Sequence, residues 1–165
     1  YSMPDDMYQR ILERIQGRGV LTVVDATRDL LVKVLPYHPF LVKPNNHELG
    51  EIFGVKLSTR EEVVPYGKKL QEMGAQNVLI SMAGEGAVLI AADGQSMEAP
   101  APKGTLVNGV GAGDSMVAGF LTGWMEKKDY VYAFHMGIAA GSASAFSENL
   151  ATREEIMQVL QQVEQ

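Results

Sequence analysis

Short apolar runs without polar alternation recur in the first half of the chain. The three clearest are Val20–Asp25, Phe40–Pro44 and Asn77–Met82. Runs of this kind, rich in β-branched and aliphatic residues, indicate strands that are buried on both faces, as in a parallel sheet. A further pair, Ala87–Ala92 and Gln95–Ala99, flanks Asp93-Gly94. This pattern predicts a β-hairpin.

Between and after these runs, apolar residues return at helical spacing. The expected helices are Pro4–Gln16, Asp29–Leu35, Glu48–Phe53, Thr59–Met73, Ser115–Glu126, Tyr130–Ser147 and Thr152–Gln165. Three of them carry a capping signal, an Asn or Thr followed three residues later by Glu, at Asn45, Thr59 and Thr152. Strands that alternate with helices, then a hairpin and a helical tail, predict one α/β domain over residues 1–165. We expect three α/β/α layers around a mainly parallel sheet with an antiparallel edge hairpin.

Composition excludes several classes of protein. The 165 residues are 46 % hydrophobic and 21 % charged, which is ordinary for a soluble globular protein. A net charge of -6 gives no basic surface for nucleic acid or an anionic membrane, and no apolar run approaches the roughly 20 residues that span a bilayer. The absence of cysteine fits a cytoplasmic location. Because the chain opens with Tyr1 rather than Met, we interpret it as a fragment or a processed piece.

The segment 107–119 carries the strongest chemical signal. Gly109, Gly111 and Gly113 alternate with small residues, Asp114 follows, and an apolar helix is expected next. Glycines allow the backbone to curl its N–H groups around an anion, and a helix N-terminus adds about half a positive charge at the same point. These features suit a phosphate group.

Three better-known phosphate or nucleophile motifs do not fit this segment. A dinucleotide fingerprint needs a sixth-position glycine, but Asp114 stands there counting from Gly109, and Met116 counting from Gly111. A P-loop needs Gly-Lys-Ser/Thr, and no lysine lies between Lys103 and Lys127. A nucleophile elbow at Ser115 would need a glycine where Val117 stands.

Asp114 has two interpretations from the residues alone. An acid in the first turn of a helix stabilises that helix, so Asp114 can be a capping residue. A negative charge beside an anion site is otherwise unfavourable unless it has a task, such as accepting the proton of an attacking hydroxyl. Both interpretations stay open at this point.

Gly111-Ala112-Gly113-Asp114 followed by Ala118-Gly119-Phe120 resembles the C-terminal signature of the ribokinase-like, phosphofructokinase B type carbohydrate kinases. The lead-in Asn108-Gly109-Val110 is more similar to the branch that contains 1-phosphofructokinase and tagatose-6-phosphate kinase. The resemblance extends over the whole chain but covers only the C-terminal, nucleotide-binding half of such a kinase. The sugar-binding motif and the lid strands of the N-terminal half have no counterpart here.

The resemblance assigns tasks to three loops that each follow an expected strand. It implies Asp114 as the general base, with the N–H groups of Gly111, Ala112 and Gly113 as an anion hole. It implies that Asn45 and Glu48, which also form a capping pair, order water around the magnesium that accompanies the nucleotide. The candidates for contact with the nucleotide are Ser81, Ala83, Gly84, Glu85, Gly86 and Gly113, with weaker ones at Ala140, Gly141, Ser144 and Ser147.

A plain structural role remains the alternative for each loop. The glycines at 84 and 86 can form an ordinary turn, and the Asn45–Glu48 pair can be only a helix cap. The three histidines are too scattered for a metal site, and each is expected to be structural.

The resemblance further implies an ATP- and Mg²⁺-dependent enzyme that phosphorylates a ketohexose phosphate. Fructose 1-phosphate, giving fructose 1,6-bisphosphate, is the first choice, and tagatose 6-phosphate is the alternative. A second alternative is a nucleotide-binding fragment without catalysis, and we expect this chain alone to be inactive. For the full-length protein we expect a cytoplasmic homodimer with no nucleic-acid or membrane partner.

Overall fold

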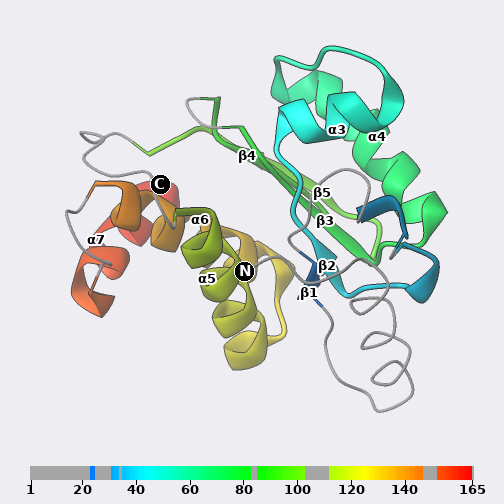
Figure 1. Cartoon of the computed structure of the whole chain (residues 1–165). Coiled ribbons are helices and arrows are strands. Elements are labelled where there is room, and N and C mark those ends of the chain that lie inside the picture. Colours follow the sequence, from blue (N-terminus) through cyan, green and yellow to red (C-terminus); the bar gives the residue numbers. More distant parts are fainter. Residues whose placement is uncertain are drawn as a thin grey trace, which may run out of the picture. The chain divides into compact units, whose positions relative to one another are not determined.

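The computed structural model of the chain describes residues 23–24, 31–33, 35–82, 85–102, 112–146 and 152–164 (Figure 1). Strands and helices alternate through residue 81, a hairpin follows, and three helices complete the chain. The α/β class expected from the sequence is therefore confirmed. The chain forms two compact units, Tyr1–Met82 with Val88–Ser96 and Ala83–Ala87 with Met97–Gln165. Each unit is described by itself below.

The sheet has five strands in the order β1-β2-β3-β4-β5. Their bounds are β1 Val23–Val24, β2 Leu41–Val42, β3 Asn77–Ser81, β4 Ala87–Ile90 and β5 Ser96–Ala99. The first three strands are parallel, with Val23 opposite Leu41 and Leu41 opposite Asn77. The short connections after β3 and β4 are compatible only with antiparallel neighbours, because a parallel crossover needs about a dozen residues or more. The sheet is therefore mixed, with parallel strands followed by an antiparallel hairpin, as expected from the sequence.

In the first unit, α3 Asn46–Phe53 and α4 Arg60–Met73 lie next to each other, and α4 packs on β3 (Figure 1). The contact is close at Gly67, where a β-carbon would stand 2.8 Å from Ile90 Cγ1 and 3.1 Å from Ile80 Cδ1. Glycine at this point lets the helix approach the strands. The core beneath these helices consists of buried aliphatic side chains, among them Val42, Leu49, Val63, Leu70, Ile80 and Ile90.

Asn77 ties the parallel strands to the hairpin. This side chain is fully buried, and its Nδ2 donates to the carbonyl oxygen of Phe40 at 2.9 Å. Its Oδ1 accepts the N–H of Ala92 at 2.7 Å. Because both ends of the amide are used, the buried polar group is satisfied, and it fixes the start of β2 against the turn that follows β4.

In the second unit, α5 Ala112–Lys127 and α6 Tyr130–Ala145 pack along each other, and α7 Arg153–Glu164 packs on α6 (Figure 1). The small residues of α5 and α6 bring their backbones into contact. A β-carbon on Gly119 would lie 2.6 Å from the carbonyl oxygen of Met136, and one on Gly137 would lie 3.0 Å from that of Met116. Glycine at these two positions therefore allows the close approach of the two helices.

Several boundaries differ from the sequence expectations. Leu35, the expected last residue of the helix before Pro36, instead begins η2, a 3-10 turn over Leu35–Tyr37. Proline is compatible with this turn because it occupies an early position, where a missing N–H costs little. The helix expected from Glu48 begins at Asn46, since Asn45 is its cap.

The expected hairpin is confirmed, but its turn is larger than Asp93-Gly94. The N–H of Ala91 bonds to the carbonyl oxygen of Gln95, and the N–H of Gly94 bonds to that of Ala91. Gly94 has a φ of 93°, so the loop is a tight turn closed by one residue in a conformation that favours glycine.

Some sequence predictions lie outside the described residues. These are the helix 4–16, most of the strand 20–25, part of the helix 29–35, and the candidate Ser147. The helix expected to reach Ser147 ends earlier, at Ala145. In the part of the chain that the structure describes, no helix has both the length and the apolar character needed to cross a membrane.

Candidate active site

The Asn45–Glu48 pair forms a complete capping box at the start of α3. Asn45 Oδ1 accepts the N–H of Glu48 at 2.8 Å, and Glu48 Oε1 accepts the N–H of Asn45 at 3.0 Å. The predicted cap is confirmed. The box uses only one carboxylate oxygen of Glu48, so Oε2 is not committed to the helix start.

The loops that follow β2 and β3 meet at the carboxyl edge of the sheet. Asn45 forms an isolated parallel bridge with Ser81, and the N–H of Ser81 donates to the carbonyl oxygen of Pro44 at 3.2 Å. Ser81 is half-buried there. Two candidate residues from separate loops are thus brought together at the edge where open α/β sheets bind ligands.

The starts of four helices are closed by a side chain of the preceding residue. In α3, α4 and α7 the capping residues are Asn45, Thr59 and Thr152, each paired with a Glu at the third helical position. In α6, Asp129 accepts the N–H groups of Val131 and Tyr132. These side chains satisfy N–H groups that have no partner inside the helix.

The start of α5 is different. This helix begins at Ala112, directly after Gly111, and glycine has no side chain that can accept an N–H. The first N–H groups of α5 therefore cannot be capped in the way seen at the other four helices. A helix N-terminus with uncapped N–H groups favours an anion, because the donors and the helix dipole act at the same point.

The backbone places Asp114 at the third position of α5. The helix begins three residues before the Ser115 start expected from the sequence, because the glycine at 113 is accommodated in its first turn. Asp114 thus lies in the first turn of α5, where both interpretations placed it. It occupies the same third position as the glutamates of the three capping boxes.

Gly86 has a structural reason to be glycine. Its φ is 101°, and a β-carbon there would collide with the carbonyl oxygen of Ala99 and with Pro100. The residue type at 86 is thus required by the fold and does not by itself indicate a ligand. The neighbouring candidate Glu85 is exposed.

The candidates near the end of α6 are buried among the helices of the second unit. Gly141 is buried, and Ser144 is only 6 % exposed. The hydroxyl of Ser144 donates to Ser115 Oγ on α5 at 2.9 Å. Sequence reasoning did not single out Ser115 for this contact, and only the spacing of small residues along both helices hinted that their faces approach.

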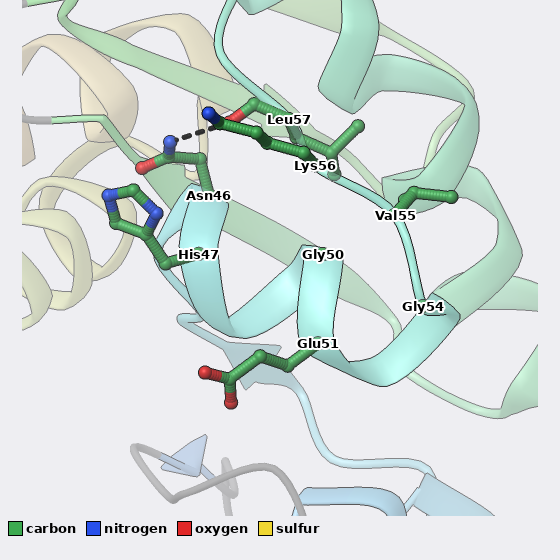
Figure 2. A pocket seen from close by; sticks show the side chains of 8 residues that line it. All are labelled: Asn46, His47, Gly50, Glu51, Gly54, Val55, Lys56 and Leu57. Atoms are coloured by element: carbon green, nitrogen blue, oxygen red, sulfur yellow. Dashed lines mark hydrogen bonds between the residues drawn. The ribbon is translucent and has the colours of Figure 1, made fainter.

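A pocket of about 390 Å³ lies beside α3, and of its lining residues the sequence analysis had considered only His47. Its polar side chains do not all point the same way. Figure 2 shows Asn46 bonded to the carbonyl oxygen of Leu57, at 2.8 Å, and Lys56 reaching over Asn46, whereas Glu51 points away from both. The arrangement offers no group of side chains aimed at one ligand.

The described residues contain one hydrogen bond of a histidine side chain and no candidate metal site. Nδ1 of His38 lies 3.1 Å from the carbonyl oxygen of Gly74, consistent with its expected structural role. Among the described residues, no group of three or more His, Cys, Asp or Glu side chains could hold a metal ion. The candidates Ala83, Gly84 and Gly111 lie outside the described residues.

Comparison with known proteins gives the family. Residues 2–157 match the profile described as pfkB family carbohydrate kinase. A 1-phosphofructokinase of Bacillus subtilis is 48 % identical over 162 residues, which cover 98 % of this chain and 53 % of that protein. A D-tagatose-1-phosphate kinase of Bacillus licheniformis is 34 % identical over 163 residues, with 98 % and 53 % covered.

Solved structures show the same fold. A candidate phosphofructokinase from Staphylococcus aureus is 40 % identical, with a TM-score of 0.91 over 98 % of this chain and 53 % of that one. For ribokinase of Arabidopsis thaliana, complexed with ribose and ATP, the identity is 21 %, the TM-score is 0.79, and 95 % and 53 % are covered. This chain spans about half the length of the relatives that it matches. It has the ribokinase-like α/β fold and belongs to the pfkB family of carbohydrate kinases.

Proposed function

We propose that this chain is the nucleotide-binding half of an ATP-dependent ketohexose-phosphate kinase that converts fructose 1-phosphate to fructose 1,6-bisphosphate. The observation that carries the proposal is the 48 % identity to a 1-phosphofructokinase along nearly the whole chain. The tagatose alternative remains, because a relative named for tagatose 1-phosphate matches over the same length at 34 % identity. Because of this relative, the alternative substrates are both tagatose 6-phosphate and tagatose 1-phosphate.

The start of α5 fits the phosphate groups of a nucleotide. Gly111 has no side chain that could cap the helix, and we infer that the N–H groups of Ala112, Gly113 and Asp114 serve as donors to phosphate. In phosphoryl transfer the protein mainly positions the reactants and neutralises developing charge. We assign the anion hole to Gly111–Gly113 on this basis, with further nucleotide contacts expected from Ser81 and residues 83–86.

We assign Asp114 as the general base that accepts the proton of the acceptor hydroxyl. As the sugar oxygen forms its bond to the γ-phosphorus, the bond from that phosphorus to the bridging oxygen breaks and ADP leaves. The hydroxyl proton passes to the Asp114 carboxylate. Reciprocal capping with Asn45 explains the acid at Glu48. Gly111 has no side chain that could form such a capping box with Asp114, so this explanation is not available at the start of α5.

Glu48 fits an indirect role toward magnesium. Magnesium bound with the nucleotide neutralises phosphate charge, and it usually keeps several waters and few protein ligands. Glu48 Oε1 is used by the capping box, which leaves Oε2 to accept a hydrogen bond from such a water. Asn45 holds the Glu48 backbone in place through its own side chain.

A steady-state assay tests the proposal. It uses the full-length kinase, meaning a protein of the relatives' length that carries this chain, with Mg-ATP and each of fructose 1-phosphate, tagatose 1-phosphate and tagatose 6-phosphate. We expect the highest kcat/KM with fructose 1-phosphate. Preference for a tagatose phosphate would favour the alternative, and no ADP production with any of the three would overturn the proposal.

The second candidate function is nucleotide binding without catalysis. It is favoured by one observation, the coverage of about half of each relative. Calorimetric titration of this chain with Mg-ADP separates the cases: binding without turnover supports a non-catalytic fragment, and no binding by a folded chain argues against both functions. A homodimeric, cytoplasmic full-length protein remains a prediction.

A further inference from the structure

We propose that Ser144 and Ser115 are positioning residues, which hold the first turn of α5, and with it Asp114, in place for the reaction. The inference rests on the proposed function. Its central observation is the hydrogen bond from the Ser144 hydroxyl to Ser115 Oγ, at 2.9 Å. Ser115 directly follows Asp114 in the first turn of α5, whereas Ser144 lies in the last turn of α6.

This hydrogen bond lies at the end of a close contact between the two helices. From the middle of α5 toward its start, the close approaches are Gly123 to Ala133, Gly119 to Met136, and Met116 to Gly137. These contacts are made by backbone and small apolar groups, which fix how near the helices lie but give little directional restraint. The serine pair adds a directional hydrogen bond where this contact between α5 and α6 reaches the first turn of α5.

The first turn of α5 needs such a link more than other helix starts do. It contains Gly113, which lowers helix propensity, and it follows Gly111, which supplies no capping side chain. Helix ends fray first when local support is weak. The other helix starts are held by side-chain caps from the preceding residue, whereas α5 is held from a neighbouring helix.

Burial explains why the pair is a link rather than two independent serines. Ser144 is 6 % exposed, so its hydroxyl requires a protein partner. A helical serine can satisfy itself on the carbonyl oxygen four residues earlier. In this structure Ser144 instead donates across to α5, which joins the two helices.

The test uses full-length kinase with Ser144→Ala, Ser115→Ala and the double variant. Ser142→Ala is the matched control, because Ser142 is a half-buried serine of the same helix, two residues away. We expect kcat to fall about tenfold in both single variants, since a displacement near 1 Å at a reacting group can cost up to about 100-fold. The KM for the sugar phosphate should change little, and the double variant should be no slower than either single one.

A second readout is independent of turnover. Amide hydrogen exchange of peptides that cover residues 112–116 should quicken in Ser144→Ala and stay unchanged in Ser142→Ala. Ser144→Cys, which keeps a weak donor in nearly the same volume, should recover part of the protection. Unchanged exchange and unchanged kcat in Ser144→Ala would overturn the inference, as would additive losses of kcat in the double variant. A wild-type protein without kinase activity would instead overturn the proposed function, and exchange alone would then decide whether the serine pair holds the turn.

Discussion

The starts of α3 and α5 place an acid at the same helical position and leave it with different surroundings. At α3, Asn45 and Glu48 form two hydrogen bonds with each other, 2.8 and 3.0 Å long, in which the backbone N–H of each residue bonds to the side chain of the other. At α5, the residue before the helix is Gly111, and Asp114 has no capping partner of that kind. A reciprocal capping box therefore accounts for the residue pair at the start of α3, and no such pair exists at α5.

This difference separates a capping signal from the proposed ligand site. The boxes of α4 and α7 repeat the arrangement of α3, with Glu62 and Glu155 at the third position. An acid in that position is thus common in this chain and carries no function by itself. The proposed phosphate site rests instead on Gly111, which has no side chain that could cap the first N–H groups of α5.

The largest expected effect comes from Asp114→Asn in the full-length kinase. The variant keeps the shape of the side chain but cannot accept a proton, and loss of a general base typically costs about 10² to 10⁴ in rate, roughly 3 to 5 kcal/mol. ATP affinity should survive. Steady-state kinetics alongside nucleotide titration measures both quantities.

Glu155→Gln is the matched control for Asp114→Asn, because it removes the same charge from the same position of α7. It should leave kcat unchanged. If Asp114→Asn kept more than about a tenth of wild-type kcat, well short of the usual loss for a base, Asp114 would only stabilise the helix.

Gly113→Ala should produce a smaller loss that affects binding as well as rate. A β-carbon in the first turn of α5 would stand where the backbone is expected to meet phosphate, so nucleotide affinity and kcat should both fall. Helix propensity alone predicts the reverse for stability, a gain of up to about 1 kcal/mol for alanine over glycine. Thermal unfolding and ADP titration together separate the two effects. A more stable variant with unchanged affinity would show that the glycine serves only the fold.

Glu48→Gln should change the magnesium requirement rather than turnover at saturation. The amide keeps an oxygen for the N–H of Asn45 but removes the charge that would order metal-bound water. The apparent magnesium requirement should rise about tenfold, the lower end of losses typical for outer-shell partners, while the KM of the sugar phosphate stays the same. Lower stability with unchanged magnesium dependence would mean that the capping box is the whole role of Glu48.

The smallest expected effect is the pH dependence contributed by Glu62 in α4. The N–H of Ser58, then the hydroxyl and N–H of Thr59, hold the pKa of the Glu62 carboxyl below its ordinary value of 4.5. A depressed folded-state pKa contributes stability above the unfolded value, and this contribution is lost as pH falls through the folded pKa. The stability difference between wild type and Glu62→Gln should therefore shrink below about pH 4.5. Urea unfolding at several pH values measures it, and a difference that grows on acidification would contradict the assignment.

The features that sequence predicted best are those made by neighbouring residues. The capping boxes at Asn45, Thr59 and Thr152 depend on hydrogen bonds between residues three apart, so their signal is local. The strand runs were found because burial on both faces leaves no polar alternation.

The features that sequence did not predict depend on distant contacts. Gly86 is glycine because Ala99 and Pro100 lie against it, and the Ser115–Ser144 hydrogen bond joins residues 29 positions apart. The start of α5 was placed too late because the low helix propensity of Gly113 argued for a loop.

Hydrogen exchange of the full-length kinase with and without saturating Mg-ADP tests most directly whether the start of α5 holds the phosphates. The compared peptides cover the starts of α5, α4 and α7, at residues 112–116, 60–64 and 153–157. If the open N–H groups of α5 bind phosphate, ADP should slow exchange at α5 and leave α4 and α7, whose starts are already capped, unchanged. Saturated ADP binding with no added protection at the start of α5 would contradict the account.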